Sequence, residues 1–369
     1  QRGAPMTPAT CLALATSLLP PAMAPNTTPA PTCVQLGAEV AGRFSMLTPI
    51  GGIDRSFALT RSRFGAGIDL NGAGARMVFT GVRSGGDNGY IGVNGESIVP
   101  QVQVAEARYH TERLGLTFGM GLVDDPWVVT SNQAWDLRAV APGLGEGQGW
   151  LERSDLGGTL AWTAPASWAT VAVLSTSGEG LSRRERNNGQ DTSGILIIRP
   201  LSSVAAPESL ELQLYGRDGS RGLGRARDHR FGARLTHRSL WTAGGIEVLR
   251  AWGVGGDALR APLGISVFGQ LTPPPLPALV FARYDHIDED LRFQQTERNI
   301  LRFGLGLELP PDHQQPPMRL LLGWDHTRQD PGATSIAGSL AQQRSSAFYV
   351  QLDFRGVASI APHASSSTL

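Results

Sequence analysis

Residues 301–309 read LRFGLGLEL, and this stretch decides the fold class. Apolar residues alternate along it with polar or small ones, so one side carries Leu301, Phe303, Leu305, Leu307 and Leu309. Successive side chains of a β-strand point to opposite faces, and a period of two therefore gives one apolar face and one polar face. The stretch predicts a β-strand with one face in an apolar environment.

The same alternation recurs along most of the chain from residue 35 onward. Many alternating stretches reach about ten residues, which suits a tilted membrane strand better than the five or six residues typical of soluble sheets. The pattern is poor in 167–177 and 192–200. About sixteen strands are predicted, near 35–47, 56–70, 74–84, 100–110, 113–122, 155–164, 167–177, 192–200, 208–217, 229–239, 241–253, 262–272, 277–286, 298–309, 317–328 and 344–355.

The connections between these stretches alternate between short and long. Short ones fall at 71–73, 111–112, 165–166 and 240, whereas three nominally short ones, at 201–207, 273–276 and 310–316, are longer and rich in proline. Long ones fall at 85–99, 123–154, 178–191, 218–228, 254–261, 287–297 and 329–343. A barrel that crosses a membrane has short turns at one rim and long loops at the other, whereas a soluble sandwich has no reason to sort its loops in this way. The sequence predicts an all-β fold, a transmembrane antiparallel up-and-down β-barrel spanning 35–356.

The composition agrees with a barrel. The chain has 369 residues, 41% of them hydrophobic, and 46 glycines. A barrel wall needs only one apolar face per strand, and no apolar run reaches the roughly 18 residues of a transmembrane helix. All 32 basic residues are arginine, and the net charge of zero gives no sign of a nucleic-acid partner. A soluble, secreted all-β protein is an alternative that solubility without detergent would identify.

Both ends of the chain differ from the predicted barrel. Residues 9–19 (ATCLALATSLL) are apolar and precede a small-residue segment at 22–24 (AMA), which together indicate a signal peptide over 1–24. The alternative is a disordered leader rich in proline and alanine, because Arg2 is the only positive residue before the apolar run. Residues 25–34 are rich in proline and threonine and are interpreted as a linker. Residues 357–369 are expected to form a flexible tail.

The longest connection, 123–154, reads VDDPWVVTSNQAWDLRAVAPGLGEGQGWLERS. It carries three of the eight tryptophans, and a long loop with three large apolar rings is expected to fold against a surface. The barrel interior is the available surface, so we expect the loop to narrow the lumen. The predicted constriction residues are Asp124, Asp125, Trp127, Trp135, Asp136, Arg138 and Glu146.

The polar faces of the strands have the opposite charge bias from this acidic loop. An acidic loop facing an arginine wall would set a transverse field across a narrow opening and orient polar solutes. Acidic residues on the wall reduce the basic excess, so only a weak anion preference is expected. The predicted pore-lining residues are Arg43, Arg61, Arg63, Arg108, Arg113, Arg230, Arg234, Arg238, Arg302 and Arg319.

Five segments, in this order, resemble the phosphate-selective porin family and related sixteen-stranded trimeric outer-membrane porins. They are ARYHTERLGLTFGMGLVDDPW at 107–127, DLGGTLAWTAP at 155–165, VAVLSTSGEG at 171–180, NNGQDTSGILIIRPL at 187–201 and SSAFYVQLDF at 345–354. The resemblance implies a homotrimeric channel of the bacterial outer membrane, with the third loop folded inward. Outer-membrane lipid and lipopolysaccharide would be its surroundings. Arginines at 183–186 and 221–227 are candidate contacts to lipopolysaccharide phosphates, with solvated loop surfaces as the equal alternative. The family's phosphate selectivity is not carried over, because this chain has no lysine and its third loop is acidic.

No motif indicates catalysis. Neither a G-x-S-x-G nor an H-E-x-x-H motif is present, and the seven histidines are scattered. The sequence predicts no enzyme, no catalytic residue, no cofactor and no metal site. Asp285, Asp288, Glu289 and Asp290 could hold a divalent cation, but a solvated acidic loop is the favoured interpretation.

The expected function is ion and solute transport by a porin. Small polar or anionic solutes would diffuse passively past loop 123–154. The alternative is a plugged outer-membrane barrel with a structural or adhesive role. The sequence does not name the solute.

Overall fold

A computed structural model describes the chain over 33–48, 54–70, 72–83, 98–111, 113–178, 180, 189–201, 209–221, 226–254, 257–273, 276–309, 318–330 and 344–360. The predicted signal peptide over 1–24, most of the predicted linker, residues 361–369 of the predicted tail, the arginines at 183–186 and Arg225 lie outside the described residues.

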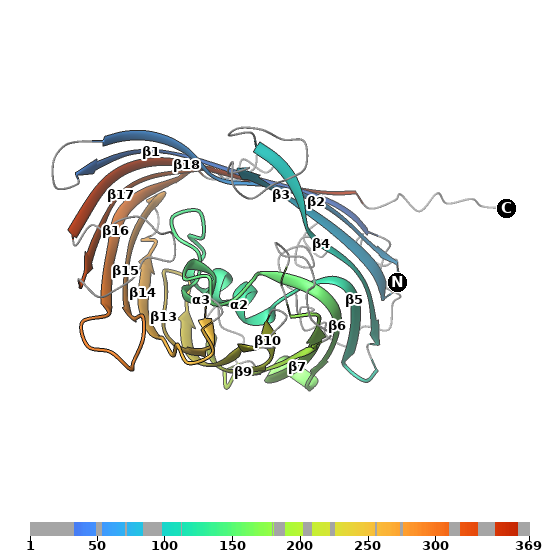
Figure 1. Ribbon diagram of the computed structural model, residues 1–369. Coiled ribbons are helices and arrows are strands. Elements are labelled where there is room, and N and C mark those ends of the chain that lie inside the picture. Colours follow the sequence, from blue (N-terminus) through green and yellow to red (C-terminus); the bar gives the residue numbers. More distant parts are fainter. Residues whose placement is uncertain are drawn as a thin grey trace.

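Sixteen antiparallel strands form a closed barrel (Figure 1). Their bounds are β1 Cys33–Thr48, β2 Asp54–Leu70, β3 Ala73–Arg83, β4 Ile98–Thr111, β5 Leu116–Asp124, β6 Ser154–Thr163, β7 Ala169–Thr176, β8 Asp191–Ile198, β9 Ser209–Asp218, β12 His229–Arg238, β13 Thr242–Trp252, β14 Leu263–Leu271, β15 Ala278–Asp288, β16 Glu297–Leu309, β17 Met318–Gln329 and β18 Arg344–Ile360. The other elements are the β10–β11 pair (Ser220–Arg221, Ala226–Arg227), α2 (Pro126–Trp135), α3 (Leu144–Gly147) and the 3₁₀ turn η1 (Pro165–Ser167).

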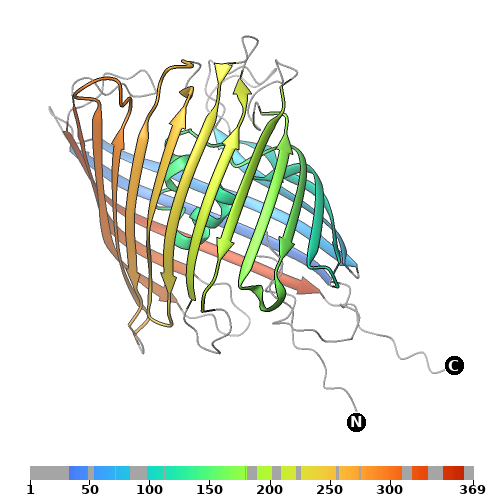
Figure 2. The same cartoon turned by 90° about the horizontal axis from the view of Figure 1, so that it is seen from below.

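Each of the sixteen predicted stretches overlaps one barrel strand, and the predicted fold class is confirmed. The bounds differ most at the ends of the chain. β1 begins at Cys33, inside the predicted linker, and β18 runs to Ile360, beyond the predicted barrel boundary at 356. These two strands close the barrel by pairing from Val34 opposite Ile360 to Thr48 opposite Ser346. The start of β1 and the end of β18 therefore lie at the same rim (Figure 2).

The outer surface of the barrel is apolar. Leu301, Phe303 and Leu305 are among its exposed large side chains, while their neighbour Arg302 bonds to Asp285 inside. Side chains alternate in the same way around the wall, so lipid would meet one continuous apolar belt. Among the described residues, no helix is long and apolar enough to cross a membrane.

Part of the inner surface is apolar as well, which explains why two predicted strands were poorly patterned. On β7 and β8 the inward-facing Leu174, Ile195 and Ile197 are buried, and Val173 on the other face is exposed. With apolar residues on both faces, the alternation that marks a half-buried strand is lost. Of these inward side chains, Ile195 and Ile197 belong to a hydrophobic cluster inside the barrel, where loop 123–154 packs.

Candidate functional site

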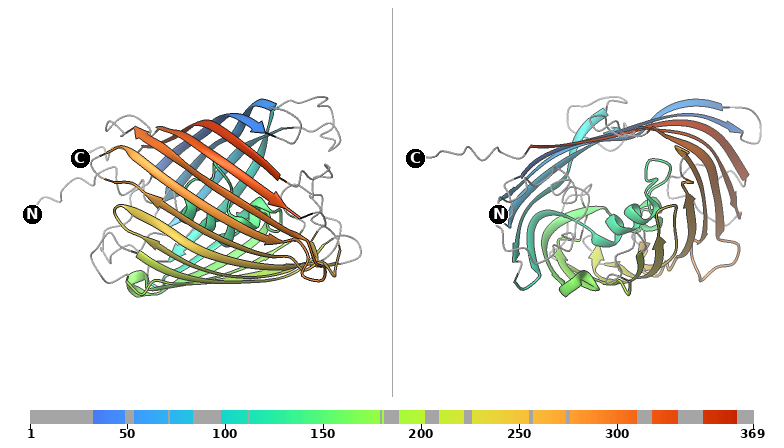
Figure 3. Two further views of the ribbon diagram at one scale, coloured as in Figure 1. Left: turned by 90° about the vertical axis from the view of Figure 1, so that its left-hand side faces the viewer. Right: turned by 180° about the vertical axis from the view of Figure 1, so that it is seen from behind.

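Loop 123–154 lies inside the barrel, as predicted (Figures 1 and 3). Its first part forms α2, and both helix ends are capped by acidic residues of the loop. Asp125 accepts hydrogen bonds from the backbone N–H groups of Trp127 and Val128, and proline occupies the first turn. Asp136 ends the helix in the left-handed conformation, with φ of 55°, and its N–H donates to the Asn132 carbonyl. The sequence DPW…WD therefore sets the length of α2.

Trp127 fixes the start of α2 to the wall. Its ring is fully buried, stacks on Tyr215 with ring centroids 5.4 Å apart, and lies under the Arg234 guanidinium, 4.0 Å from the ring centroid. Arg234 also pairs with Glu247 at 3.2 Å and donates to the Trp127 carbonyl at 3.0 Å. Gly232 permits this packing, because a Cβ there would lie 2.7 Å from the Trp127 ring. Stacking, a cation–π contact and apolar burial all hold the same ring.

Trp135 fixes the other end of α2 in a second hydrophobic cluster. It meets Phe268 and Phe281 edge-on, with ring centroids 5.8 and 6.2 Å away. The Arg283 guanidinium lies 5.5 Å from the Trp135 ring centroid and donates to the Pro142 carbonyl at 2.8 Å. The loop is therefore anchored through apolar rings to β9, β12, β14 and β15.

Wall arginines bind the loop backbone as well. Arg230 donates to the Trp150 carbonyl at 2.8 Å, Arg43 to the Val140 carbonyl at 2.7 Å, and Arg238 to the Gln133 carbonyl at 2.9 Å. A buried carbonyl needs a donor, and an arginine supplies one from a side chain long enough to cross from wall to loop. These arginines therefore hold the loop in place.

Two of the loop acids face wall arginines. Asp136 accepts from Arg319 and Arg355, each at 2.9 Å. Burial alone would raise the pKa of Asp136, but the two guanidinium groups outweigh it and hold that pKa below its usual value. Asp124 pairs with Arg76 at 3.0 Å and with Arg153 at 3.1 Å.

Two further loop acids, Asp125 and Glu146, do not face the arginine wall, which corrects part of the expectation of an acidic loop opposite a basic wall. Asp125 is the helix cap and accepts from the Tyr215 hydroxyl at 2.7 Å; burial raises its pKa. Glu146 pairs inside the loop with Arg138, whose Nε donates at 3.0 Å, and accepts from the Asn132 amide at 2.7 Å. Burial would raise the pKa of Glu146, but Arg138 lowers it to about 2.

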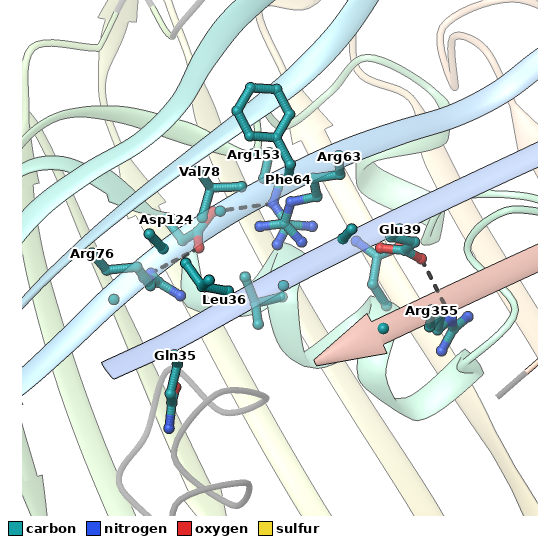
Figure 4. A pocket seen from close by; sticks show the side chains of 18 of the residues that line it. Gln35, Leu36, Glu39, Arg63, Phe64, Arg76, Val78, Asp124, Arg153 and Arg355 are labelled. Atoms are coloured by element: carbon teal, nitrogen blue, oxygen red, sulfur yellow. Dashed lines mark hydrogen bonds and ion pairs between the residues drawn. The ribbon is translucent and has the colours of Figure 1, made fainter. Parts of the chain in front are cut away.

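An open cavity of about 330 Å³ remains between α2 and the wall formed by β1, β2 and β3 (Figure 4). Four carboxylates line it, those of Glu39, Asp69, Asp124 and Asp136. Seven arginines line it: Arg61, Arg63, Arg76, Arg108, Arg138, Arg153 and Arg355. The cavity is therefore locally basic, and it lies on the side of the lumen that the two hydrophobic clusters leave open.

The predicted pore-lining arginines divide into four groups. Three line this cavity: Arg61, Arg63 and Arg108. Five bind loop atoms: Arg43, Arg230, Arg234, Arg238 and Arg319. Arg302 pairs with Asp285 at 2.6 Å, away from the cavity. Arg113 was wrongly placed on a strand; it is exposed in the turn between β4 and β5, since β5 begins only at Leu116.

The barrel also brings to the loop or the cavity several arginines that were not among the predicted pore-lining residues. They are Arg76, Arg283, Arg298 and Arg355. For three of them a signal was present. Arg76 precedes Met77, which is exposed on the outer face, and Arg283 lies between outward-facing Ala282 and Tyr284. Arg355 continues the inward series after Asp353.

Among the described residues, the carboxylates of the acidic segment at 285–290 do not gather into a group of three that could hold a metal ion. These carboxylates are separated and used in different contacts. Asp285 points to Arg283 and Arg302, Glu289 pairs with an arginine on each side, and Asp290 pairs with Arg292. Carboxylates that arginines already neutralise do not gather around one ion.

Several solved structures share this barrel. OmpT, an outer membrane protein of Vibrio cholerae solved in a trimer form, has a TM-score of 0.56 at 12% identity and covers 89% of this chain and 100% of its own. An anion-selective porin from Comamonas acidovorans has a TM-score of 0.56 at 14% identity and covers 89% and 100%. OmpF of Salmonella typhi, in complex with daunomycin, has a TM-score of 0.60 at 9% identity and covers 88% and 97%. The chain has the porin fold. No protein-family model and no curated protein matches the sequence, so the likeness concerns the fold and not the solute.

Proposed function

We propose that this chain is a porin of the bacterial outer membrane, through which small polar or anionic solutes diffuse passively. The arginine-lined cavity beside loop 123–154 carries the proposal, because it is an open space in a closed barrel with an apolar outer belt. A space of about 330 Å³ bounded by charged side chains suits hydrated small solutes. The proposal includes no catalytic step.

The passage lies on one side of the lumen, against β1 to β4. Loop 123–154 fills the opposite side with Trp127, Leu144 and Trp150, which pack on the inward faces of β6 to β9 and β13. The constriction is therefore formed by the loop and the β1–β3 wall, and not by a central eyelet. Because carboxylates accompany the arginines along it, we expect a weak preference for anions.

We also propose a homotrimer embedded among outer-membrane lipid and lipopolysaccharide. The Vibrio cholerae barrel solved in a trimer form supports this proposal, since its fold covers most of this chain. Chemical cross-linking in detergent would show a ladder ending at three subunits.

Single-channel conductance of the refolded protein under a salt gradient tests the function. We expect current steps that come in threes and a small reversal potential of the sign for anions. A folded barrel without current would contradict the channel and favour the alternative, a plugged barrel with a structural or adhesive role. That alternative is kept because two hydrophobic clusters bind the loop inside the lumen.

A further inference from the structure

An apolar groove lies on the lipid-facing side of four neighbouring strands, β16, β17, β18 and β1 (Figure 1). Its volume is about 360 Å³. Outward-facing side chains line it, among them Phe303, Leu305, Leu322, Trp324, Phe348 and Val350. The Trp324 ring lies between two others, with its centroid 5.0 Å from that of Phe303 and 6.4 Å from that of Phe348. The outer belt is therefore indented at this place, and a flexible apolar chain can lie in the indentation.

The outward-facing residues become polar between this groove and the rim that carries the long connections. On β17 the outward residues after Trp324 are His326 and Arg328, and they lie opposite Ser346 and Arg344 of β18. His326 stacks on Trp324 with ring centroids 5.3 Å apart, and its Nδ1 is hydrogen-bonded to the Ser346 hydroxyl at 2.9 Å. A strand rises about 3.4 Å per residue, so the Cα atoms of the two arginines lie about 14 Å beyond the Trp324 level. The surface therefore has an apolar part and, above it, a cationic part.

Arg328 and Arg344 are like charges placed face to face. They are directly opposite each other in the register of β17 and β18, and both side chains are exposed. Within the part of the chain that the structure describes, neither guanidinium forms an ion pair or a hydrogen bond. Like charges directly opposite on a sheet destabilise it, and at the headgroup level of a membrane the anions that neutralise arginines are lipid phosphates.

We propose that this surface binds one molecule of lipopolysaccharide, with a phosphate of its lipid headgroup on Arg328 and Arg344 and an acyl chain in the groove. The inference rests on the outer-membrane part of the proposed function and not on conduction. A phosphate monoester carries about two negative charges and three acceptor oxygens, so it can bridge two guanidinium groups. The phosphodiester of an ordinary phospholipid carries only one charge. The rim with the long connections also faces the outer leaflet in barrels of this kind, which is the leaflet that contains lipopolysaccharide.

The two parts of the surface contribute in different ways. The groove gains little from burial, because lipid tails are apolar wherever they lie, and it selects a chain by close packing. The arginines supply most of the affinity through charge-assisted hydrogen bonds to the phosphate. Removal of an arginine should therefore weaken binding of a phosphorylated lipid, and filling of the groove should weaken it independently of the charge.

The charge is tested by native mass spectrometry of the refolded barrel in detergent, titrated with diphosphorylated lipid A, the lipid part of lipopolysaccharide. Wild type is compared with R328Q, with R344Q, and with R113Q, which removes the same charge from an exposed turn at the opposite rim. The dissociation constant of the first bound lipid should rise roughly tenfold to a hundredfold in R328Q and in R344Q, as expected for loss of hydrogen bonds to a charged group. It should stay unchanged in R113Q. Equal constants in all four proteins would overturn the site.

The groove is tested by V350W, which fills it with a ring and keeps both arginines. The control is V267W, which places the same ring on the exposed outward face of β14, outside the groove. Lipid A should bind more weakly to V350W and normally to V267W. If V350W binds lipid A normally and instead forms fewer trimers, a second copy of the chain covers the groove and the proposal is wrong.

Two further outcomes are decisive. Equal affinity of wild type for phosphatidylglycerol and for lipid A would overturn the assignment to lipopolysaccharide. A barrel that binds lipid A through Arg328 and Arg344 but carries no current would retain the site and contradict the channel, whereas current without arginine-dependent binding would do the reverse. Heat-modifiable migration on a gel confirms that each variant is folded.

Discussion

Replacing Glu146 by glutamine should loosen loop 123–154 by an amount that depends on pH. The pKa of Glu146 falls from 4.5 to about 2 in the folded protein, through Arg138, despite the burial of the carboxyl group. A shift of one pKa unit corresponds to about 1.4 kcal/mol, so the pairing contributes about 3 kcal/mol to stability at neutral pH. Because the folded-state pKa is lowered, this contribution is complete above pH 4.5 and is lost as the pH falls toward 2.

Denaturant unfolding of the refolded barrel, followed by tryptophan fluorescence, measures the effect at pH 7, 4.5, 3 and 2. The difference in unfolding free energy between wild type and E146Q should be about 3 kcal/mol at pH 7 and should shrink to about 0.4 kcal/mol at pH 2, where about half of wild-type Glu146 is itself protonated. E297Q is a suitable control, because the Glu297 side chain is exposed at the start of β16, outside loop 123–154. A difference that stays constant from pH 7 to pH 2 would refute the assignment of the pairing to charge.

Three further predictions concern packing, selectivity and membrane insertion. G232A should lower the free energy of unfolding by roughly 1–3 kcal/mol, because the new Cβ collides with the Trp127 ring. G216A is the control, since a Cβ at that position has no atom within 4 Å, and its unfolding free energy should not fall. Identical unfolding curves for the two variants would contradict this prediction. D136N removes a negative charge from the cavity and should move the reversal potential under a salt gradient toward stronger anion preference. A reversal potential that moves toward cation preference would contradict the passage beside α2. L305R places a charge on the lipid-facing belt and should cost roughly 2–4 kcal/mol of insertion free energy. The measurement is the yield of folded barrel in lipid vesicles, which should be lower than for wild type. An unchanged yield would contradict the outward orientation of Leu305.

The sequence was sufficient for the barrel because strand order and pairing follow from local patterns. Strands such as β16 alternate without a break, and the connections alternate in length, so every strand and its neighbours could be predicted. The same reasoning was weakest at β7 and β8. There the inner face packs against the loop and is as apolar as the outer one, so the period of two disappears.

The sequence was sufficient for only part of the site. The alternation along each strand predicts that Arg43, Arg63 and Arg234 face inward, but it does not predict which of them contacts the loop. Those contacts depend on the position of α2 in the lumen, which is set by long-range contacts such as the stacking of Trp127 on Tyr215. The sequence likewise could not show that Glu146 would be neutralised by Arg138, because the loop first has to fold back on itself.

The seam between β1 and β18 joins residues from opposite ends of the chain, whereas the packing of the loop uses segments from α2 to β15 for the most part. Contacts that are near in sequence close smaller loops and form faster. We therefore expect the loop to settle on the concave side of a partly assembled, still open sheet, with the terminal strands joining last. In this order of assembly, the central strands acquire their curvature while they pack against the tryptophan-rich loop. The loop is then already in place when the terminal strands close the lumen.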